Sequence, residues 1–380
     1  MKSLIDLAAC CLVSVLLFSG SLFGNAQKTI LVTGGAGYIG SHTCKALSDA
    51  GFIPVTYDSL VIGDKSLVKW GPLVVGDLLD VKRLERVFEE YKPVAIIHLA
   101  GFCNIGEAVA NPSKYYTNNV SGSINLLNMM IKFQVKNLVF SSSCTVYGDC
   151  LKSPISESCP QAPTNPYARS KFMIERIIQD YASTHSLNYM ILRYFNAAGV
   201  DIESGLRRSN QSLGFLIPKG ILAALHPDDP LSVFGTNYPT PDGTAIRDYI
   251  HVLDLARAHV LSLQYLFEEK KSDELNLGSG KGYSVLDIIQ EIENVVGKKV
   301  PYTLGQPRKG DVPESVAEIR KAAAVLQFTP QHSDLRTMIE SEWLSIQKHK
   351  QTGKDLHFKP PLGCTVQRVL PPASISPACK

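Results

Sequence analysis

The chain has 380 residues and a formal net charge of +3 at pH 7, and 45% of its residues are hydrophobic. This size and balance fit one large globular unit or two domains that share a cleft. Basic residues are dispersed along the chain and are nearly matched by acidic ones, 38 against 35. A nucleic-acid-binding protein needs a concentrated basic surface, so the composition argues against nucleic acid as a partner.

Residues 1–26 have the pattern of a targeting segment. Lys2 precedes an apolar run from Leu7 to Phe18, and small residues spaced like a cleavage site follow at 24–26. The pattern favours a cleaved signal peptide, and therefore export or the secretory pathway. The alternatives are an uncleaved anchor, which would make the membrane a partner, and an incorrectly assigned start on a cytoplasmic protein.

Cysteine usage indicates a different compartment from the leader. Two of the nine cysteines lie in the leader, and the remaining odd number lacks the spacing of metal-ligand pairs. The sequence therefore predicts neither a disulfide framework nor a metal site. The cysteines outside the leader are Cys44, Cys103, Cys144, Cys150, Cys159, Cys364 and Cys379.

Apolar strands alternate with helical segments in the first half of the chain. Strands are expected at 28–35, 52–58, 72–77, 93–101, 137–143 and 189–196, and helices at 38–51, 81–91, 111–133 and around Tyr167. Near-continuous apolar strands linked by helices are typical of a parallel sheet covered on both faces. We therefore predict an α/β fold with a Rossmann-type doubly wound sheet over residues 27–196.

The regular alternation of strands and helices ends after Asn196. A polar stretch at 201–214 and a Pro/Gly/Asp-rich loop at 234–244 interrupt the helices. Ser284 and Asp287 have the spacing of a capping pair for a helix at 284–296. Long loops commonly carry binding residues. We expect a smaller α/β substrate domain over 197–349 and an irregular tail over 350–380.

Three glycines, Gly34, Gly37 and Gly40, lie between the first strand and its helix. Their missing side chains let the turn tighten and let the backbone approach a pyrophosphate at the helix N-terminus. Asp58 ends the second strand about 20 residues later, where an acid accepts the ribose hydroxyls of NAD and repels the 2′-phosphate of NADP. The order of strand, loop, helix and acid predicts an NAD site.

Tyr167 and Lys171 stand four residues apart at the start of a helix. A phenol with a pKa of about 10 is a poor base at neutral pH, and an ammonium one turn away favours its phenolate. Such a phenolate can take a proton from a sugar hydroxyl while the same carbon gives a hydride to nicotinamide. A surface pair is the ordinary explanation of this spacing, but the upstream cofactor loop favours catalysis.

Ordered motifs from Thr29 to about Gln347 resemble the extended short-chain dehydrogenase/reductases and, within them, the UDP-glucose 4-epimerases. The motifs are TGGAGYIGSHTC, GDLLD, HLAG, YYTNNV, FSSSCTVYG, NPYARSK, LRYFNAAG, FGTNYPTPDGTAIRDYIHVLDLA and PRKGD. The resemblance implies an NAD-dependent isomerase that interconverts UDP-glucose and UDP-galactose through a 4-keto intermediate. It also implies a homodimer.

The resemblance assigns roles to individual residues. Ser143 would bridge the substrate and Tyr167, Lys171 would also bind the nicotinamide ribose, and Phe195 or Tyr194 would face the turning sugar. The implied cofactor-binding residues are Gly34, Gly37, Tyr38, Ile39, Gly40, Asp58, Asp77, Leu78, Asn118 and Lys171. The implied substrate-binding residues are Ser143, Tyr167, Phe195, Asn196, Arg247, Arg308 and Asp311, with both arginines suited to phosphate.

The chain departs from the family pattern at three places. Cys103 stands where many members have a lysine near the cofactor, and Gly214 and Phe215 stand where relatives often have Asn or His facing the nucleotide. Ser315 stands where a large tyrosine restricts some relatives to plain hexoses. A small residue there predicts that UDP-N-acetylhexosamines are also accepted.

Two other functions stay open on sequence alone. A related dehydratase would carry Asp-Glu after the strand that ends in Ser143, whereas this chain has Cys144 and Thr145. A non-catalytic NAD-binding protein is the other alternative, and the presence of Tyr167 and Lys171 argues against it. The sequence does not rank hexoses against the pentoses of UDP-xylose and UDP-arabinose.

Overall fold

The computed structural model describes residues 28–150, 152–208, 214–307 and 311–351. The expected leader, the expected tail beyond residue 351 and Arg308 lie outside the described residues, so the predictions made for them stay predictions. Within the described ranges, no helix is long and apolar enough to cross a membrane.

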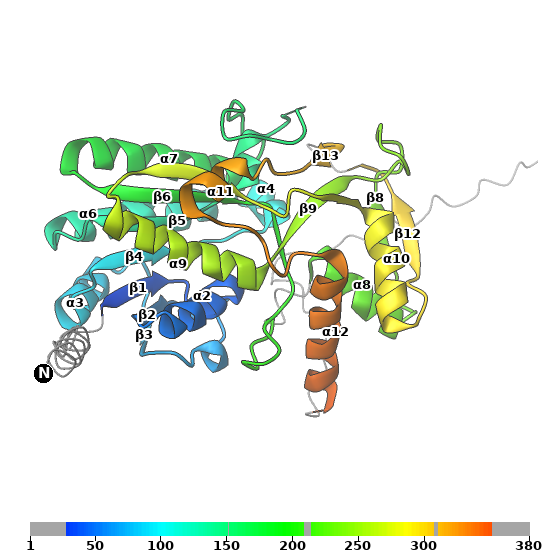
Figure 1. Ribbon diagram of the computed structural model, residues 1–380, viewed down its shortest axis with the longest axis horizontal. Coiled ribbons are helices and arrows are strands. Elements are labelled where there is room, and N and C mark those ends of the chain that lie inside the picture. The colour runs from blue at the N-terminus through cyan, green and yellow to red at the C-terminus, as the bar shows by residue number, and fades with distance from the viewer. Residues whose placement is uncertain (1–27, 151, 209–213, 308–310, 352–380) are drawn as a thin grey trace, which may run out of the picture.

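A seven-stranded parallel sheet forms the larger lobe, with the strand order β10-β6-β5-β4-β1-β2-β3. Its strands β1 to β6 are labelled in Figure 1. Its strands are β1 (Thr29–Thr33), β2 (Ile53–Asp58), β3 (Leu73–Val75), β4 (Ala95–His98), β5 (Asn137–Ser143), β6 (Asn188–Tyr194) and β10 (Asp273–Leu277). β2 and β3 follow β1 on one side of the sheet, and β5, β6 and β10 follow β4 on the other. The strand order therefore reverses between the neighbours β1 and β4. This topology confirms the predicted α/β class with a Rossmann-type doubly wound sheet.

Helices cover both faces of this sheet. One face packs against α2 (Tyr38–Asp49), α9 (Val252–Glu268) and α11 (Arg320–Leu326). The other packs against α3 (Val81–Tyr91), α6 (Gly122–Lys132) and α7 (Pro166–His185). Successive side chains of a strand point to opposite faces, so Ile30 and Val32 join the first core and Leu31 the second. Burial on both faces explains why these strands are apolar throughout.

A four-stranded mixed sheet, a two-stranded parallel sheet and three helices form the smaller lobe. β9 (Ile246–His251) pairs with β7 (Asn196–Ala198), β11 (Gly282–Ser284) and β13 (Glu314–Ser315), and β8 (Leu231–Phe234) pairs with β12 (Tyr302–Gly305). The helices are α8 (Leu216–Leu225), α10 (Val285–Val296) and α12 (Leu335–Gln351). The predicted capping box at Ser284 and Asp287 is present at the start of α10.

The domain boundary predicted at residue 196 stays a prediction. Two elements from beyond that residue belong to the first sheet or pack against it. β10 comes from the later part of the chain but extends the first sheet, where Asp273 pairs with Met190. α9 also comes from beyond residue 196 and packs on that sheet. A local pattern predicts a strand but does not say which sheet edge the strand will join.

The single helix expected over 111–133 is divided into several elements. After α4 (Ile105–Ala110), the range contains α5 (Pro112–Tyr115), a π-helical turn at Tyr116–Ser121 and then α6. Two short 3₁₀ helices, Lys65–Leu67 and Cys144–Tyr147, follow β2 and β5.

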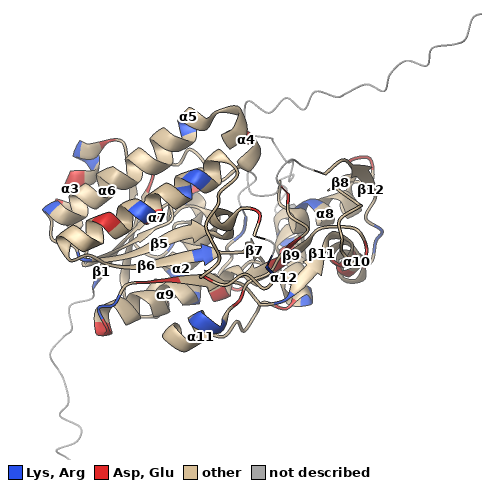
Figure 2. Cartoon of the chain, turned by 90° about the horizontal axis from the view of Figure 1, so that it is seen from above, with Lys and Arg blue, Asp and Glu red and all other residues tan. Residues whose placement is uncertain are grey.

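Basic and acidic residues are interspersed along α7 (Figure 2).

A disulfide joins Cys150 and Cys159 in the segment between β5 and α7. No disulfide was expected from the sequence, and this bond corrects that prediction. Pairing depends on how the loop brings two thiols together, and a sequence separation of 9 carries no signal for that. The other cysteines within the described ranges, Cys44, Cys103 and Cys144, are free.

Candidate functional site

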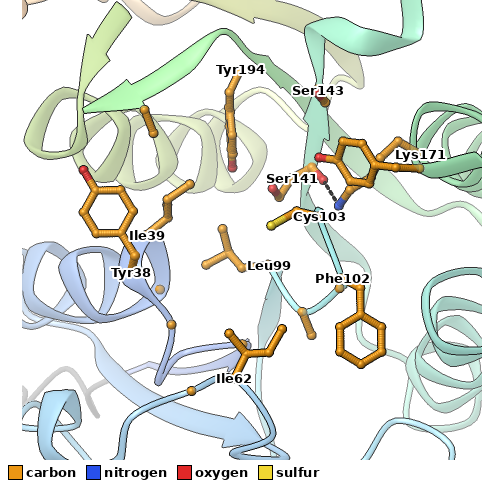
Figure 3. Close-up of a pocket in the computed structure, with 18 of the residues that line it drawn as sticks. Tyr38, Ile39, Ile62, Leu99, Phe102, Cys103, Ser141, Ser143, Lys171 and Tyr194 are labelled. Atoms are coloured by element: carbon orange, nitrogen blue, oxygen red, sulfur yellow. Dashed lines mark hydrogen bonds between the residues drawn. The ribbon is translucent and has the colours of Figure 1, made fainter. Parts of the chain in front are cut away.

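A cavity of about 440 Å³ opens at the carboxyl ends of the parallel strands. In open α/β sheets ligands bind at this edge, where the strand order reverses. Figure 3 shows Tyr38 and Ile39 on one side of the cavity, Ser143 and Lys171 on the other, and Leu99 between them. The cavity therefore spans the glycine loop and the Tyr167 helix.

Close packing requires glycine at two positions of the loop between β1 and α2. Gly34 has a φ of 74°, and a Cβ there would lie 2.7 Å from the amide nitrogen of Ala100. A Cβ on Gly40 would lie 2.1 Å from the carbonyl oxygen of Gly34. Gly37 caps α2 without a side-chain hydrogen bond, and the first residues of this helix line the cavity. The free amides of a helix N-terminus are suited to binding an anion.

Asp58 is held rigidly beside this loop. Its carboxylate accepts hydrogen bonds from the backbone amides of Ala36 at 3.0 Å and Leu60 at 2.9 Å. Burial raises the pKa of Asp58, and these two bonds oppose the rise. Asp77, Leu78 and Asn118 also line the cavity. Most of the cofactor-binding residues expected from the sequence are thus gathered along one wall.

Tyr167 and Lys171 enter the cavity from the first turns of α7. Asn165 caps the helix by accepting the amide of Ala168 at 2.9 Å, and Pro166 occupies the first helical position. The Lys171 ammonium donates to the carbonyl oxygen of Ser141 at 2.7 Å (Figure 3). Cap and proline fix where the helix begins, and hence the direction of both side chains.

The protein groups around Tyr167 favour its neutral phenol. Burial raises the pKa of Tyr167, the thiols of Cys103 and Cys144 raise it further, and a hydrogen bond from Ser143 lowers it. Burial lowers the pKa of Lys171 to about 8, against the opposing effects of Cys103 and Glu175. The four-residue spacing predicted that Lys171 would favour the phenolate, but its ammonium is directed at Ser141.

A buried ion pair anchors α7 under the site. Arg193 and Glu175 are 3% and 0% exposed, and they form two bonds, Nε to Oε1 at 3.1 Å and Nη2 to Oε2 at 2.8 Å. Arg193 also donates to the Tyr147 hydroxyl at 3.0 Å, and Ser142 donates to Glu175. The pair joins the helix of Tyr167 and Lys171 to the strand ends at Ser142 and Arg193.

The expected substrate residues are only partly brought together. Phe195 and Asn196 line the cavity, and Asn196 is fixed by donating to the Asp248 carbonyl oxygen at 2.8 Å. Arg247 and Asp311 pair with each other at 3.7 Å but lie beyond the residues that line the cavity. Arg308 lies outside the described residues.

The cavity also includes residues that no motif predicted. Val61, Ile62 and Arg208 line it, all from segments without a helical or strand period. In the sequence, Arg208 is marked only by its positive charge within the polar stretch at 201–214. Within the part of the chain that the structure describes, no cluster of three or more His, Cys, Asp or Glu could hold a metal.

Comparisons with known proteins agree with this geometry. A family model described as NAD dependent epimerase/dehydratase family matches residues 30–278. A UDP-glucose 4-epimerase of Rhizobium meliloti is 45% identical over 329 residues, which cover 86% of this chain and 99% of the relative.

Solved structures agree as well. A UDP-glucose 4-epimerase from Brucella ovis in complex with NAD is 45% identical, with a TM-score of 0.81, and covers 83% of this chain and 98% of its own. A UDP-Glc/GlcNAc 4-epimerase from Campylobacter jejuni is 34% identical, with a TM-score of 0.74, over 84% of this chain and 99% of its own. These matches confirm the predicted enzyme class and NAD as the cofactor. The chain therefore belongs to the NAD dependent epimerase/dehydratase family, among its UDP-glucose 4-epimerases.

Proposed function

We propose that the chain interconverts UDP-glucose and UDP-galactose at C4, with NAD held permanently in the cavity. The observation that carries the proposal is the placement of Ser143, Tyr167 and Lys171 in the same cavity as the glycine loop and Asp58. Asp58 and the first amides of α2 suit the adenosine ribose and the diphosphate of NAD. The residues present therefore fit this cofactor.

Tyr167 acts as the proton acceptor and donor of the reaction. Bound NAD supplies the hydride acceptor and, in its oxidised form, a positive charge that favours the phenolate. Tyr167 takes the proton of the C4 hydroxyl while the C4–H bond breaks and its hydride leaves, which gives a 4-keto sugar. After the sugar turns over, Tyr167 would return the proton to the C4 oxygen, and bound NAD would supply the hydride for the other face of C4. Ser143 holds the phenol in place through their hydrogen bond.

The test uses the purified full-length chain. NAD should be released on denaturation, and the native protein should convert UDP-galactose to UDP-glucose without added NAD. Bound NAD without conversion would instead support the non-catalytic NAD-binding protein. Formation of a 4-keto-6-deoxy sugar nucleotide would support the dehydratase.

We also propose that the site accepts UDP-N-acetylhexosamines. Ser315 is buried in β13 and hydrogen-bonds the thiol of Cys144, which lines the cavity. A tyrosine there would fill space that an N-acetyl group needs. We expect the wild type to epimerise UDP-N-acetylglucosamine, and Ser315→Tyr to lose that activity but keep UDP-galactose conversion. No turnover of the N-acetyl sugar by the wild type would refute the proposal.

A homodimer and export are two further proposals. Ile105 and Val109 on α4 and Met173 on α7 are exposed apolar side chains, which supports a docking surface for a second copy. Sedimentation at micromolar concentration should give a dimer, and a monomer would contradict it.

Cell fractionation with an epitope at the C-terminus tests the leader, and retention in the cytoplasm of an unprocessed chain would contradict export.

A further inference from the structure

Arg208 is a buried cation inside the cavity. It is 4% exposed and lines the cavity between the two lobes. Its Nε donates to Oε1 of Glu342 at 2.5 Å, and its Nη2 donates to the hydroxyl of Tyr38 at 3.0 Å and to the carbonyl oxygen of Ala197 at 3.1 Å. Burial is the largest single influence and lowers the pKa of Arg208, but Glu342 and Tyr38 together raise it, so the net shift is upward and the guanidinium keeps its charge.

The guanidinium lies between the starts of two helices. It stacks on the ring of Tyr38, the first residue of α2, at 3.9 Å, and lies 5.5 Å from the ring of Phe215, the N-cap of α8. Neither helix has a side-chain hydrogen bond at its cap. The first residues of both helices, including Leu216 of α8, line the cavity. Arg208 therefore stands where two sets of amide donors approach the same space.

The charges around the cavity make Arg208 distinctive. Among the described lining residues the cations are Lys171 and Arg208, and the acids are Asp58 and Asp77. Lys171 is directed at the carbonyl of Ser141 beside Tyr167. The positive charge near the starts of α2 and α8 thus comes from Arg208.

The proposed reaction brings two diphosphates into this cavity, one in NAD and one in the UDP-sugar. We propose that Arg208 is a positioning residue for a nucleoside diphosphate: its charge attracts the diphosphate, and its contact with Tyr38 fixes the start of α2. This inference rests on the proposed function. The alternative is a purely structural ion pair that ties the cavity wall to α12 through Glu342.

The two partners of the pair separate these explanations. Arg208→Met removes the positive charge from the cavity. Glu342→Gln keeps an acceptor for Nε but removes the negative charge that offsets Arg208. Because both variants break a buried ion pair, both should lower thermal stability. A structural role predicts that both also weaken nucleotide binding, whereas an electrostatic role predicts opposite effects on it.

The experiment measures UDP affinity by calorimetry on the NAD-containing full-length protein, and the NAD retained after gel filtration. We expect Arg208→Met to weaken UDP binding roughly tenfold and Glu342→Gln to tighten it about threefold. Glu340→Gln removes the same charge from a more exposed position on α12, where Glu340 pairs with Arg336, and should change neither quantity.

The outcomes are distinct. Opposite shifts in UDP affinity assign Arg208 to the substrate diphosphate, and opposite shifts in retained NAD alone assign it to the cofactor diphosphate. Shifts in the same direction, or no shift, overturn the inference. If Arg208→Met does not fold, Glu342→Gln decides the case, because tighter binding cannot follow from the loss of a structural contact. A wild type without NAD and UDP binding would refute the proposed function instead.

Discussion

The carboxylate of Asp58 favours NAD over NADP. Both of its oxygens are already oriented by backbone amides, those of Ala36 and Leu60. A ribose that donates to this preorganised carboxylate therefore loses little entropy on binding. The same negative charge disfavours a 2′-phosphate.

Asp58→Ala should release the cofactor more readily. Hydrogen bonds to a charged group contribute about 1.5–3 kcal/mol each, so we expect NAD to bind roughly 10- to 100-fold more weakly. The NAD content of the purified variant, measured after denaturation, checks this. Asp49→Ala is the control, because Asp49 pairs with Lys45 on the exposed end of α2. Equal NAD content in Asp58→Ala and the wild type would contradict the prediction.

Residues at strand ends were predictable from the sequence, and residues from loops were not. The carboxyl ends of parallel strands meet at one edge, so the order of the motifs is enough to place Gly34, Asp58 and Ser143 together. Arg208 reaches the cavity through an irregular segment and a partner on α12, Glu342. No local period encodes such a contact.

At the scale of elements, the Glu175–Arg193 pair sets the position of α7. Both groups are buried and bonded twice to each other, so removing one leaves an uncompensated charge in the interior. Arg193→Met should lower the free energy of unfolding by about 3–5 kcal/mol. Urea denaturation at neutral pH measures it.

A second variant separates charge from packing in that prediction. The double variant Glu175→Met/Arg193→Met removes both charges and should recover much of the loss, because apolar side chains of similar size can replace a buried pair. A loss below about 1 kcal/mol in Arg193→Met alone would contradict a structural role for the pair.

The helix expected over 111–133 shows where element prediction from sequence stops. Asn119 accepts the amide of Phe102 at 2.9 Å and donates to the Phe102 carbonyl oxygen at 3.0 Å and to the hydroxyl of Ser170 at 3.2 Å. These contacts hold the π-helical turn between the cavity and α7. They come from residues distant in sequence, so a helical period alone could not predict the break.

At the scale of the whole molecule, four buried histidines make the fold sensitive to acid. Burial lowers the pKa of His98 to about 3 and those of His42, His251 and His259 to about 4. The unfolded chain binds these protons near the ordinary histidine pKa of about 6.5. The stability they contribute is therefore complete above that pKa and is lost as the pH falls toward 4.

Urea unfolding at pH 7 and pH 5 should show this loss. Each histidine should cost up to about 2 kcal/mol over that interval, because the unfolded state takes up a proton that the native state does not. His98→Asn should flatten the pH dependence by about that amount. Equal stability of the wild type at both pH values would contradict the prediction.

The two lobes and the shared cavity depend on long-range pairing. The sequence predicted the parallel sheet, because its strands are apolar on both faces. It did not predict that β10 would join β6, or that the disulfide would close the segment before α7. The first depends on pairing between segments far apart in the sequence, and the second on the conformation of a single loop.

The most direct test of the account is Tyr167→Phe. The variant keeps the ring and the fold but has no hydroxyl proton to exchange. We expect NAD content to stay at the wild-type level and UDP-galactose conversion to fall roughly 10²- to 10⁴-fold, as for loss of a general acid–base group. Tyr181→Phe, which removes an exposed hydroxyl bond to Asn128 from the same helix, should convert normally. Undiminished conversion by Tyr167→Phe would contradict the account.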